Sequence, residues 1–400
     1  MSIAAINDNG KPTDWWFAYK LPKMNNPLDH AGATLGKSNG TEYLYCDDKN
    51  PALPKKLSLN KEILKSGALV NTLQQLRDAA KKKDKNIGWF FYNDEYTKTT
   101  SGTNKTNNQK NGHTKGVLAF DIQSNTAFWI LHSWPCYPSI KKVKEPSPDM
   151  GQTFLCITLK NIKAVDDIAA GFHLATQPQI IEMSLPKGID AKKYPNIIQL
   201  AKTAPPAHVP SGASLPETIP FSSKKGQAFL YLAKSKDWKV PAGSIGKSPE
   251  AKNAFDQEEK DLYSDHIGPT LKINLEVETW QIGEKDNDSD RKHSTNDIQW
   301  VDLRALDPSL NYAWHFLMHD HAKWAISKNE TKTTETDWVI VADINRIDTQ
   351  YNRGGGGIAF KNKALAHSLH TISKMVPPAE DEKVIGKKKE EKIKDQLNRK

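Results

Sequence analysis

Both halves of this 400-residue chain contain an apolar segment that begins with His-x-Lys and continues into a polar turn and a second apolar segment. His113–Lys115 leads into "GVLAFD" and "TAFWILHSWP", and His321–Lys323 leads into "WAIS" and "DWVIVADIN". Chance would place roughly 1.5 such triplets in a chain of this composition, so a triplet alone indicates nothing. The shared layout instead predicts two structurally related halves.

Alternating or continuous apolar residues predict strands in both halves. The expected strands are residues 14–22, 87–94, 113–122, 126–135, 152–159, 271–280, 321–327 and 337–345. Amphipathic stretches predict helices at residues 60–85 and 362–376. The Pro- and Ser-rich stretch 202–220 predicts a linker, and "NRGGGG" predicts a flexible turn. The chain therefore divides into residues 1–205, residues 206–376 and a charged tail, 377–400, in a mixed α/β fold.

Composition limits the class of protein. Hydrophobic residues make up 37% and charged residues 26%, as in soluble globular proteins, and no apolar run is long enough to span a membrane. The net charge of +9 favours a polyanionic partner, although a Lys-rich surface alone would give the same value. The cysteines Cys46, Cys136 and Cys156 form neither a disulfide framework nor a Cys-x-x-Cys motif.

The triplets carry groups suited to phosphodiester chemistry. On a strand, residues two apart face the same side, so each His projects to the same side as its Lys. Asp121 is an even number of residues from His113 and is therefore expected on that side as well. If the two triplets meet, two ammonium groups hold the non-bridging oxygens of a phosphate. One neutral imidazole attacks phosphorus while the other, protonated, supplies a proton to the leaving oxygen. Such a site needs no metal or other cofactor.

Several stretches, in this order along the chain, resemble the deoxyribonuclease II family. They are "GKPTDWWFAYKLP", "GWFFYND", "GHTKGVLAFD", "WILHSWP", "GQTFLCITL", "DLYSDH", "DHAKWAIS", "VADINR" and "RGGGG". The resemblance implies a phospholipase D-like pseudo-dimer, in which each half has a central β-sheet flanked by helices. It also implies metal-independent DNA cleavage, usually favoured at acidic pH, that leaves 3′-phosphate and 5′-hydroxyl ends.

The resemblance also implies which residues form the site. The family's catalytic pairs fall on His113 with Lys115 and on His321 with Lys323. Supporting positions of the family fall on His132, Ser133, Asp343 and Asn345. Asp121 is a further candidate, because the strand pattern places it on the same side as His113. Either His could be the nucleophile, because the two triplets are equivalent at this level.

Some features depart from the secreted, disulfide-bonded animal members of the family. Ala325 and Val341, or their neighbours, stand where those members have Cys, and Cys156 has no N-terminal cysteine to pair with. The start of the chain lacks a basic segment followed by an apolar one. These departures predict a bacterial member that is cytoplasmic or unconventionally exported.

Two alternatives stay open. His315, His319 and His321 lie close in sequence and could bind zinc in a metal-dependent hydrolase. A non-catalytic nucleic-acid-binding protein would also fit the charge. For the nuclease, the expected partner is double-stranded DNA read with little sequence preference, and the sequence leaves open single-stranded DNA and a homodimer that surrounds the duplex.

Overall fold

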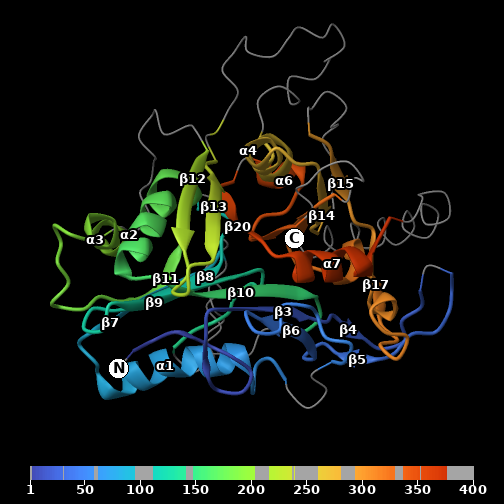
Figure 1. Ribbon diagram of the computed structural model, residues 1–400, viewed down its shortest axis with the longest axis horizontal. Helices are drawn as coiled ribbons and strands as arrows, with labels where there is room; N and C mark the ends of the chain where they lie inside the picture. Colours follow the sequence, from blue (N-terminus) through green and yellow to red (C-terminus); the bar gives the residue numbers. More distant parts are fainter. Residues whose placement is uncertain are drawn as a thin grey trace, which may run out of the picture.

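The computed structural model describes residues 2–29, 31–57, 62–94, 111–140, 147–202, 216–236, 238, 260–280, 293–328, 337–351 and 353–375. Two large sheets form the molecule, one from each half of the chain (Figure 1). This arrangement confirms the predicted mixed α/β class with a central sheet in each half.

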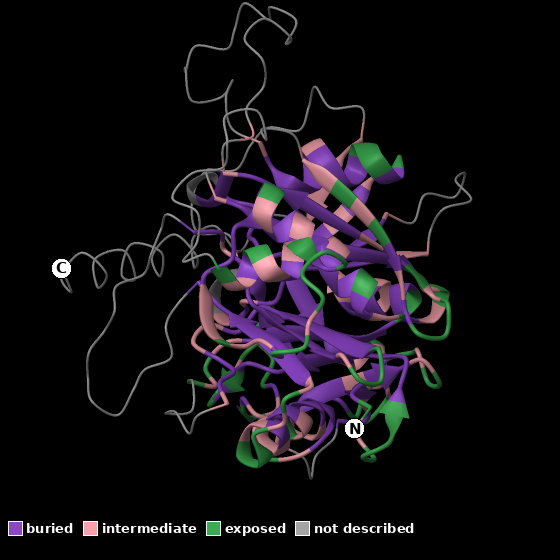
Figure 2. Ribbon diagram, turned by 90° about the vertical axis from the view of Figure 1, so that its left-hand side faces the viewer, coloured by how far each residue is buried: buried purple, intermediate pink, exposed green. Residues whose placement is uncertain are grey.

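The first sheet has seven strands, and every neighbouring pair is antiparallel. In spatial order they are β11 (Ile180–Ser184), β7 (Ile87–Tyr92), β8 (Gly116–Asp121), β9 (Thr126–His132), β10 (Gln152–Leu159), β3 (Trp15–Lys20) and β6 (Tyr43–Asp47). The inner strands are buried along their whole length because both faces of the sheet are covered (Figure 2).

The second sheet also has seven strands, and only its β14–β15 pair is parallel. In spatial order they are β12 (Glu217–Ser222), β13 (Ala228–Lys234), β20 (Gly355–Lys361), β19 (Trp338–Ala342), β18 (Trp324–Ser327), β14 (Leu275–Glu278) and β15 (Thr295–Asp297). The run β14-β18-β19-β20-β13 repeats the antiparallel order of β7-β8-β9-β10-β3. A triplet therefore precedes the equivalent strand, β8 or β18, in each sheet.

Helices and apolar clusters complete the layers. The helices are α1 (Ala68–Lys82), α2 (Ile162–Gly171), α3 (Pro195–Lys202), α4 (Gly268–Leu271), α5 (Phe316–His319), α6 (Asp348–Tyr351) and α7 (Lys363–Ile372), with π-helices η1 (Phe172–Thr176) and η2 (Leu262–Ile267) and the 3-10 helix η3 (Leu303–Ala305). α1 covers the outer face of the first sheet, and η2 with α4 covers the outer face of the second. The largest apolar cluster joins both sheets with α2 and α7, so the two halves share one core.

Short strands lie outside the two sheets. They are β1 (Ala5–Ile6), β2 (Pro12–Thr13), β4 (Lys23–Met24), β5 (Ser38–Asn39), β16 (Trp300–Asp302), β17 (Ala313–His315) and β21 (Ser373–Lys374). None of the helices in the described parts of the chain combines the length and apolar character needed to cross a membrane.

Three local predictions differ from the structure. α1 begins at Ala68 because Gly67 adopts a φ of 90°, which ends the preceding turn region. The triplets stand just before strands β8 and β18 rather than within them. The last three residues of the glycine run 354–357 belong to β20 rather than to a flexible turn, because they pair with β13 and β19. The side chains of Ile344 and Tyr231 leave no room for a Cβ at Gly355 and Gly356. Most of the predicted linker (203–215) and the tail beyond residue 375 lie outside the described residues.

Candidate active site

The two triplets meet where the halves join, and each is bound by the opposite half. The amide of His113 donates to the carbonyl oxygen of Gly354 at 2.7 Å, and the amide of His321 donates to that of Gly151 at 3.0 Å. Gly354 and Gly151 are equivalent, because each stands just before the strand, β20 or β10, that borders β19 or β9. The antiparallel order brings the starts of β8, β10, β18 and β20 to one region between the sheets.

The close approach at these two positions requires glycine. A Cβ on Gly354 would lie 2.7 Å from the carbonyl oxygen of Thr176, and one on Gly151 would lie 2.3 Å from Oδ1 of Asp320. A further backbone-to-side-chain bond, from the amide of Lys323 to Oγ1 of Thr153 at 3.2 Å, also joins the second triplet to the first half. The position of each triplet thus depends on the other half of the chain.

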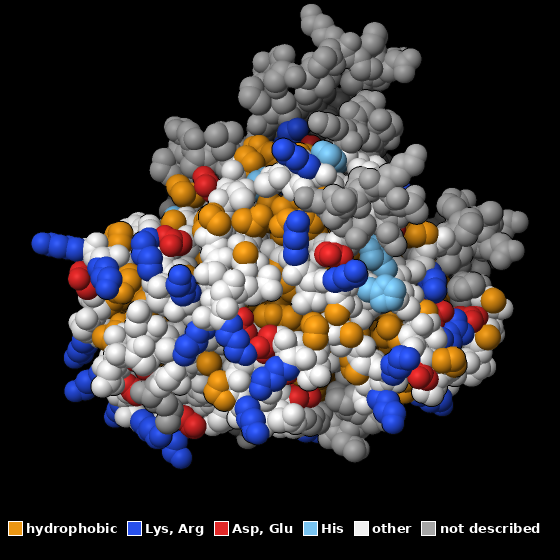
Figure 3. Space-filling view, in the orientation of Figure 1, with side chains coloured by type: hydrophobic (Ala, Val, Ile, Leu, Met, Phe, Trp, Pro, Cys, Tyr) orange, Lys and Arg blue, Asp and Glu red, His pale blue; other side chains and the backbone are white. Residues whose placement is uncertain are grey.

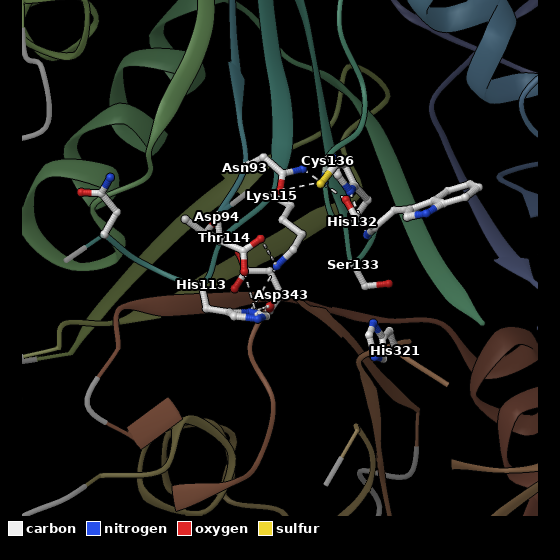
Figure 4. A network of polar contacts seen from close by, with 12 residues as sticks. Asn93, Asp94, His113, Thr114, Lys115, His132, Ser133, Cys136, His321 and Asp343 are labelled. Atoms are coloured by element: carbon white, nitrogen blue, oxygen red, sulfur yellow. Dashed lines mark hydrogen bonds and ion pairs between the residues drawn. The ribbon is translucent and has the colours of Figure 1, made fainter. Parts of the chain in front are cut away.

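The first triplet lies against a buried carboxylate that the sequence analysis did not select. Asp94 follows β7, and its Oδ1 lies 2.9 Å from Nζ of Lys115 while its Oδ2 lies 3.2 Å from Nε2 of His113. Nη1 of Arg353 approaches the same carboxylate at 3.9 Å. On the other side of the ring, Nδ1 of His113 lies 2.7 Å from the carbonyl oxygen of Asp343 (Figure 4). The sequence signal was a polar pair, Asn93–Asp94, directly after an apolar strand.

The surroundings shift the protonation of these groups. Burial would raise the pKa of Asp94, but Lys115, His113 and Arg353 together hold it well below its usual range. Burial and the ammonium group of Lys115 lower the pKa of His113, while Asp94 opposes them. The Asp343 carbonyl oxygen can only accept, so Nδ1 carries a proton. The lowered pKa favours the neutral ring, in which Nε2 keeps its lone pair, whereas the Asp94 carboxylate beside Nε2 favours a second proton there.

The second triplet has a different environment. Nζ of Lys323 donates to the carbonyl oxygen of His321 at 2.8 Å, and burial, together with Lys115, lowers the pKa of Lys323 to about 7. Strand register makes Trp280 the counterpart of Asp94, because Glu278 pairs with Trp324 as Tyr92 pairs with Gly116. The Trp280 ring lies 4.8 Å from the His321 ring, centroid to centroid. One histidine therefore faces a carboxylate and the other an indole.

His132, at the end of β9, is a fixed hydrogen-bond donor. Its Nδ1 accepts from the amide of Trp134 at 3.1 Å, which places the proton of the neutral ring on Nε2. Burial, Lys115 and Lys323 lower its pKa to about 3, so the ring is neutral at any ordinary pH. In the described part of the chain its buried Nε2 has no hydrogen-bond partner, which leaves this donor available to an anion.

Ser133 and Asp343 occupy equivalent positions in the two halves. Oγ of Ser133 accepts from the amide of Thr153 at 3.0 Å, and Oδ1 of Asp343 accepts from the amide of Gly356 at 2.8 Å. Asp343 also accepts from Oγ1 of Thr114 at 2.5 Å, and burial raises its pKa to about 7. Both residues hold strand ends in place beside the triplets.

Asn345 and Asp121 are the two remaining candidate residues. Asn345 is buried after β19, and its amide donates to Oε1 of Gln350 at 2.6 Å. Asp121 stands at the opposite end of β8 from Lys115, where it accepts from the amide of Gln123 and the hydroxyl of Ser124 in the β8–β9 turn. The length of β8 therefore separates Asp121 from the other candidates.

The described residues do not form the zinc site that His315, His319 and His321 could have made. His315 ends β17, where its ring packs against Trp300 and Phe316, while His319 ends α5. Within the described ranges, no three His, Cys, Asp or Glu side chains form a group that could hold a metal ion. The three cysteines are free thiols.

Positive charge at the surface is dispersed on the face that Figure 3 shows. Lys and Arg side chains are spread over this face, with Asp and Glu among them. The site instead concentrates positive charge in buried groups, since Lys115 and Lys323 are 0% and 2% exposed. Specific affinity for a phosphate is therefore expected at the site rather than over this surface.

Comparisons with known proteins cover nearly the whole chain. The family model described as Deoxyribonuclease II matches residues 4–378. A Burkholderia pseudomallei (strain K96243) protein named "Putative deoxyribonuclease-2" is 37% identical over 383 residues, which are 94% of this chain and 94% of the relative. A Caenorhabditis elegans protein named "Deoxyribonuclease-2" is 30% identical over 399 residues and covers 93% of each chain. The solved yeast tyrosyl-DNA phosphodiesterase aligns with a TM-score of 0.28 and 9% identity, over 63% of this chain and 67% of its own.

Proposed function

Because the chain belongs to the deoxyribonuclease II family, we propose that it is an endonuclease that hydrolyses DNA phosphodiesters between its two His-x-Lys triplets. The observation that carries the proposal is the reciprocal binding of the triplets. The amide of His113 is held by Gly354 and that of His321 by Gly151, which supports a single site that uses both imidazoles and both ammonium groups. DNA is the substrate class that the family supports.

In the first step, Nε2 of His113 attacks phosphorus and the bond from phosphorus to the 5′ oxygen breaks. His113 suits this role, because the Asp343 carbonyl oxygen holds the Nδ1 proton and the lowered pKa keeps the ring neutral. The imidazolium of His321 gives its proton to the departing 5′ oxygen. The product of this step is a phosphohistidine whose phosphorus remains bonded to the 3′ oxygen of the upstream fragment, and the downstream fragment leaves with a 5′-hydroxyl.

In the second step, water attacks the phosphohistidine while His321, now neutral, accepts the proton of the water. The bond from phosphorus to Nε2 breaks, which restores His113 and leaves a 3′-phosphate and a 5′-hydroxyl. Lys115, Lys323 and the Nε2 proton of His132 stabilise the charge on the non-bridging oxygens, so the residues supply the positive charge without a metal.

Binding of the substrate requires a rearrangement of charges in the site. Asp94 lies 3.2 Å from Nε2 of His113, where the phosphate must approach. The phosphate therefore takes the place of the carboxylate beside Nε2, and Lys115 and Arg353 exchange one anion for the other. A homodimer that surrounds the duplex stays a prediction, which light scattering with and without DNA would check.

The test is plasmid cleavage in excess EDTA, from about pH 4.5 to about pH 8, by wild type, His113→Ala and His321→Ala. We expect cleavage by the wild type and none by either variant, with binding of a DNA duplex retained by both. Mass spectrometry of His321→Asn, quenched in alkaline denaturant because a phosphohistidine is labile in acid, would detect the intermediate, since loss of the His321 base slows the attack of water on it. Cleavage that EDTA abolishes and zinc restores would contradict the proposal.

A further inference from the structure

Two lysines outside the triplets have buried ammonium groups at equivalent places in the two halves. Lys20 ends β3 and Lys234 ends β13, and besides the lysines of the triplets they are the buried lysines among the described residues. In the sheets β3 borders β10 and β13 borders β20 (Figure 1). Lys20 pairs with Gln152, and Lys234 pairs with Gly355 in the same way. Each lysine therefore lies beside the residue that follows a glycine that holds a triplet. Lysine is rarely buried in full, so this matched pair indicates a role.

Nζ of Lys20 holds the backbone segment that leads into Gly151. It donates to the carbonyl oxygens of Leu21 and Gly40 at 2.8 Å each and to that of Pro148 at 2.9 Å. Three acceptors require three N–H donors, so the group that makes these bonds is an ammonium ion. Burial lowers the pKa of Lys20 to about 7, so this form is present in acidic to neutral solution. The ammonium group thus fixes the segment three residues before the glycine.

Nζ of Lys234 holds the backbone segment that leads into Gly354. It donates to the carbonyl oxygen of Tyr351 and, at 2.8 Å, to that of Arg353. Arg353 directly precedes the glycine, and its side chain approaches the Asp94 carboxylate at 3.9 Å. One ammonium group therefore fixes the backbone of a residue that contacts the first triplet's carboxylate and leads into the glycine that holds the triplet.

The support that the two lysines give is crossed between the halves. The carbonyl oxygen of Gly151 accepts from the amide of His321, and that of Gly354 accepts from the amide of His113. The lysine of the first half therefore supports the triplet of the second half, and the lysine of the second half supports the triplet of the first. Hydrogen bonds from a charged donor are about twice as strong as neutral ones, so these bonds suit the fixing of a segment.

We propose, resting on the proposed function, that Lys20 and Lys234 are positioning residues, each of which aligns the triplet of the opposite half. Lys20 acts on His321, and therefore on the transfer of a proton to the leaving oxygen and from the attacking water. Lys234 acts on His113, and therefore on the attack at phosphorus. Each lysine acts through a backbone segment rather than by contact with the phosphate.

A substrate whose leaving group needs no proton separates the two roles. In thymidine 3′-(para-nitrophenyl phosphate) the attack at phosphorus releases para-nitrophenolate without a general acid, whereas hydrolysis of the phosphohistidine still requires a base. In Lys20→Met we expect a burst of nitrophenolate at close to the wild-type rate, followed by turnover reduced by at least about tenfold. In Lys234→Met we expect no burst, because the attack itself is slowed by about 10- to 100-fold.

Two further measurements use the same variants. On DNA, whose leaving oxygen needs a proton, both variants should lose rate. Mass spectrometry after a quench in alkaline denaturant should find the phosphohistidine accumulated in Lys20→Met and not in Lys234→Met. Lys20→Gln and Lys234→Gln retain a neutral hydrogen-bond donor and give the same comparison where methionine prevents folding.

Asp166→Ala is the control for a general loss of stability. Asp166 is buried and accepts from the amides of Asn196 and Ile197, which ties α2 to α3. This variant should unfold at a lower urea concentration than the wild type and keep the rates of both phases.

His321→Asn, assayed first on the same ester, fixes the roles of the two histidines and should itself show the burst. With the roles fixed in this way, the proposal is overturned if both lysine variants lose the two phases equally, or if the burst disappears only in Lys20→Met. Either result beside EDTA-resistant cleavage by the wild type would leave the proposed function intact, whereas a wild type without cleavage would overturn both.

Discussion

The amide of His113 donates to the carbonyl oxygen of Gly354 across 2.7 Å, which binds the first triplet to the second half of the chain. His321 makes the equivalent bond to Gly151 in the first half. Each half thus supplies part of the support for the triplet of the other half. The candidate site therefore depends on both halves of the chain.

Gly354→Ala should reduce cleavage by about 100-fold, because displacement of a reacting group by about 1 Å has that effect on rate. The new Cβ would lie 2.7 Å from the carbonyl oxygen of Thr176, so the backbone that holds His113 must shift. Gly188→Ala is the control, since its Cβ would meet only Cδ1 of Ile122 at 3.4 Å. Initial rates of plasmid cleavage measure the effect, and equal rates for the two variants would contradict it.

Cleavage should weaken as the pH rises through about 7. Burial and Lys115 lower the pKa of Lys323 to about 7, so its ammonium group is present below that pH and lost above it. Asp343 titrates over the same range, so the observed limb belongs to the coupled groups. We expect kcat/KM to fall about tenfold per pH unit on the alkaline side. A rate that stays constant up to about pH 9 would show that Lys323 remains charged.

Asp94→Asn should destabilise the fold by about 3–5 kcal/mol, because it leaves the buried Lys115 without its counter-charge. Inorganic phosphate should restore part of this loss by supplying an anion between Lys115 and Arg353. Urea unfolding with and without phosphate measures both effects. Asp167→Asn is the control, because it removes only an exposed ion pair with Lys163 and should cost no more than about 1 kcal/mol. Phosphate that stabilises both variants equally would argue against an anion site at Lys115.

His132→Phe should lower kcat by about 100- to 1000-fold and leave the pH limbs where they are. Phenylalanine keeps a ring to pack against Phe154 but cannot donate a hydrogen bond from the position of Nε2. Because the pKa of His132 is lowered to about 3, its loss removes no titrating group from the working range. Disappearance of a limb in the pH profile of the variant would instead make His132 an acid or base.

The sequence alone determined most of the strands of this protein and its candidate reacting groups. Strands such as β8 and β9 are apolar runs closed by turn residues, and local patterns of this kind depend on neighbours in the chain. The repeated layout around His113 and His321 indicated two related halves and a shared site. These inferences rest on periodicity and on the chemistry of side chains, which the sequence contains.

Only the tertiary structure decided which other residues join the site. Asp94 meets Lys115 through the pairing of β7 with β8, and Asp121 is excluded because it ends the same strand that Lys115 precedes. The unequal surroundings of the two histidines, Asp94 for one and Trp280 for the other, also arise from strand register. Burial and charges from distant segments set the protonation of Lys323 and Glu278, and no local pattern encodes these long-range contacts.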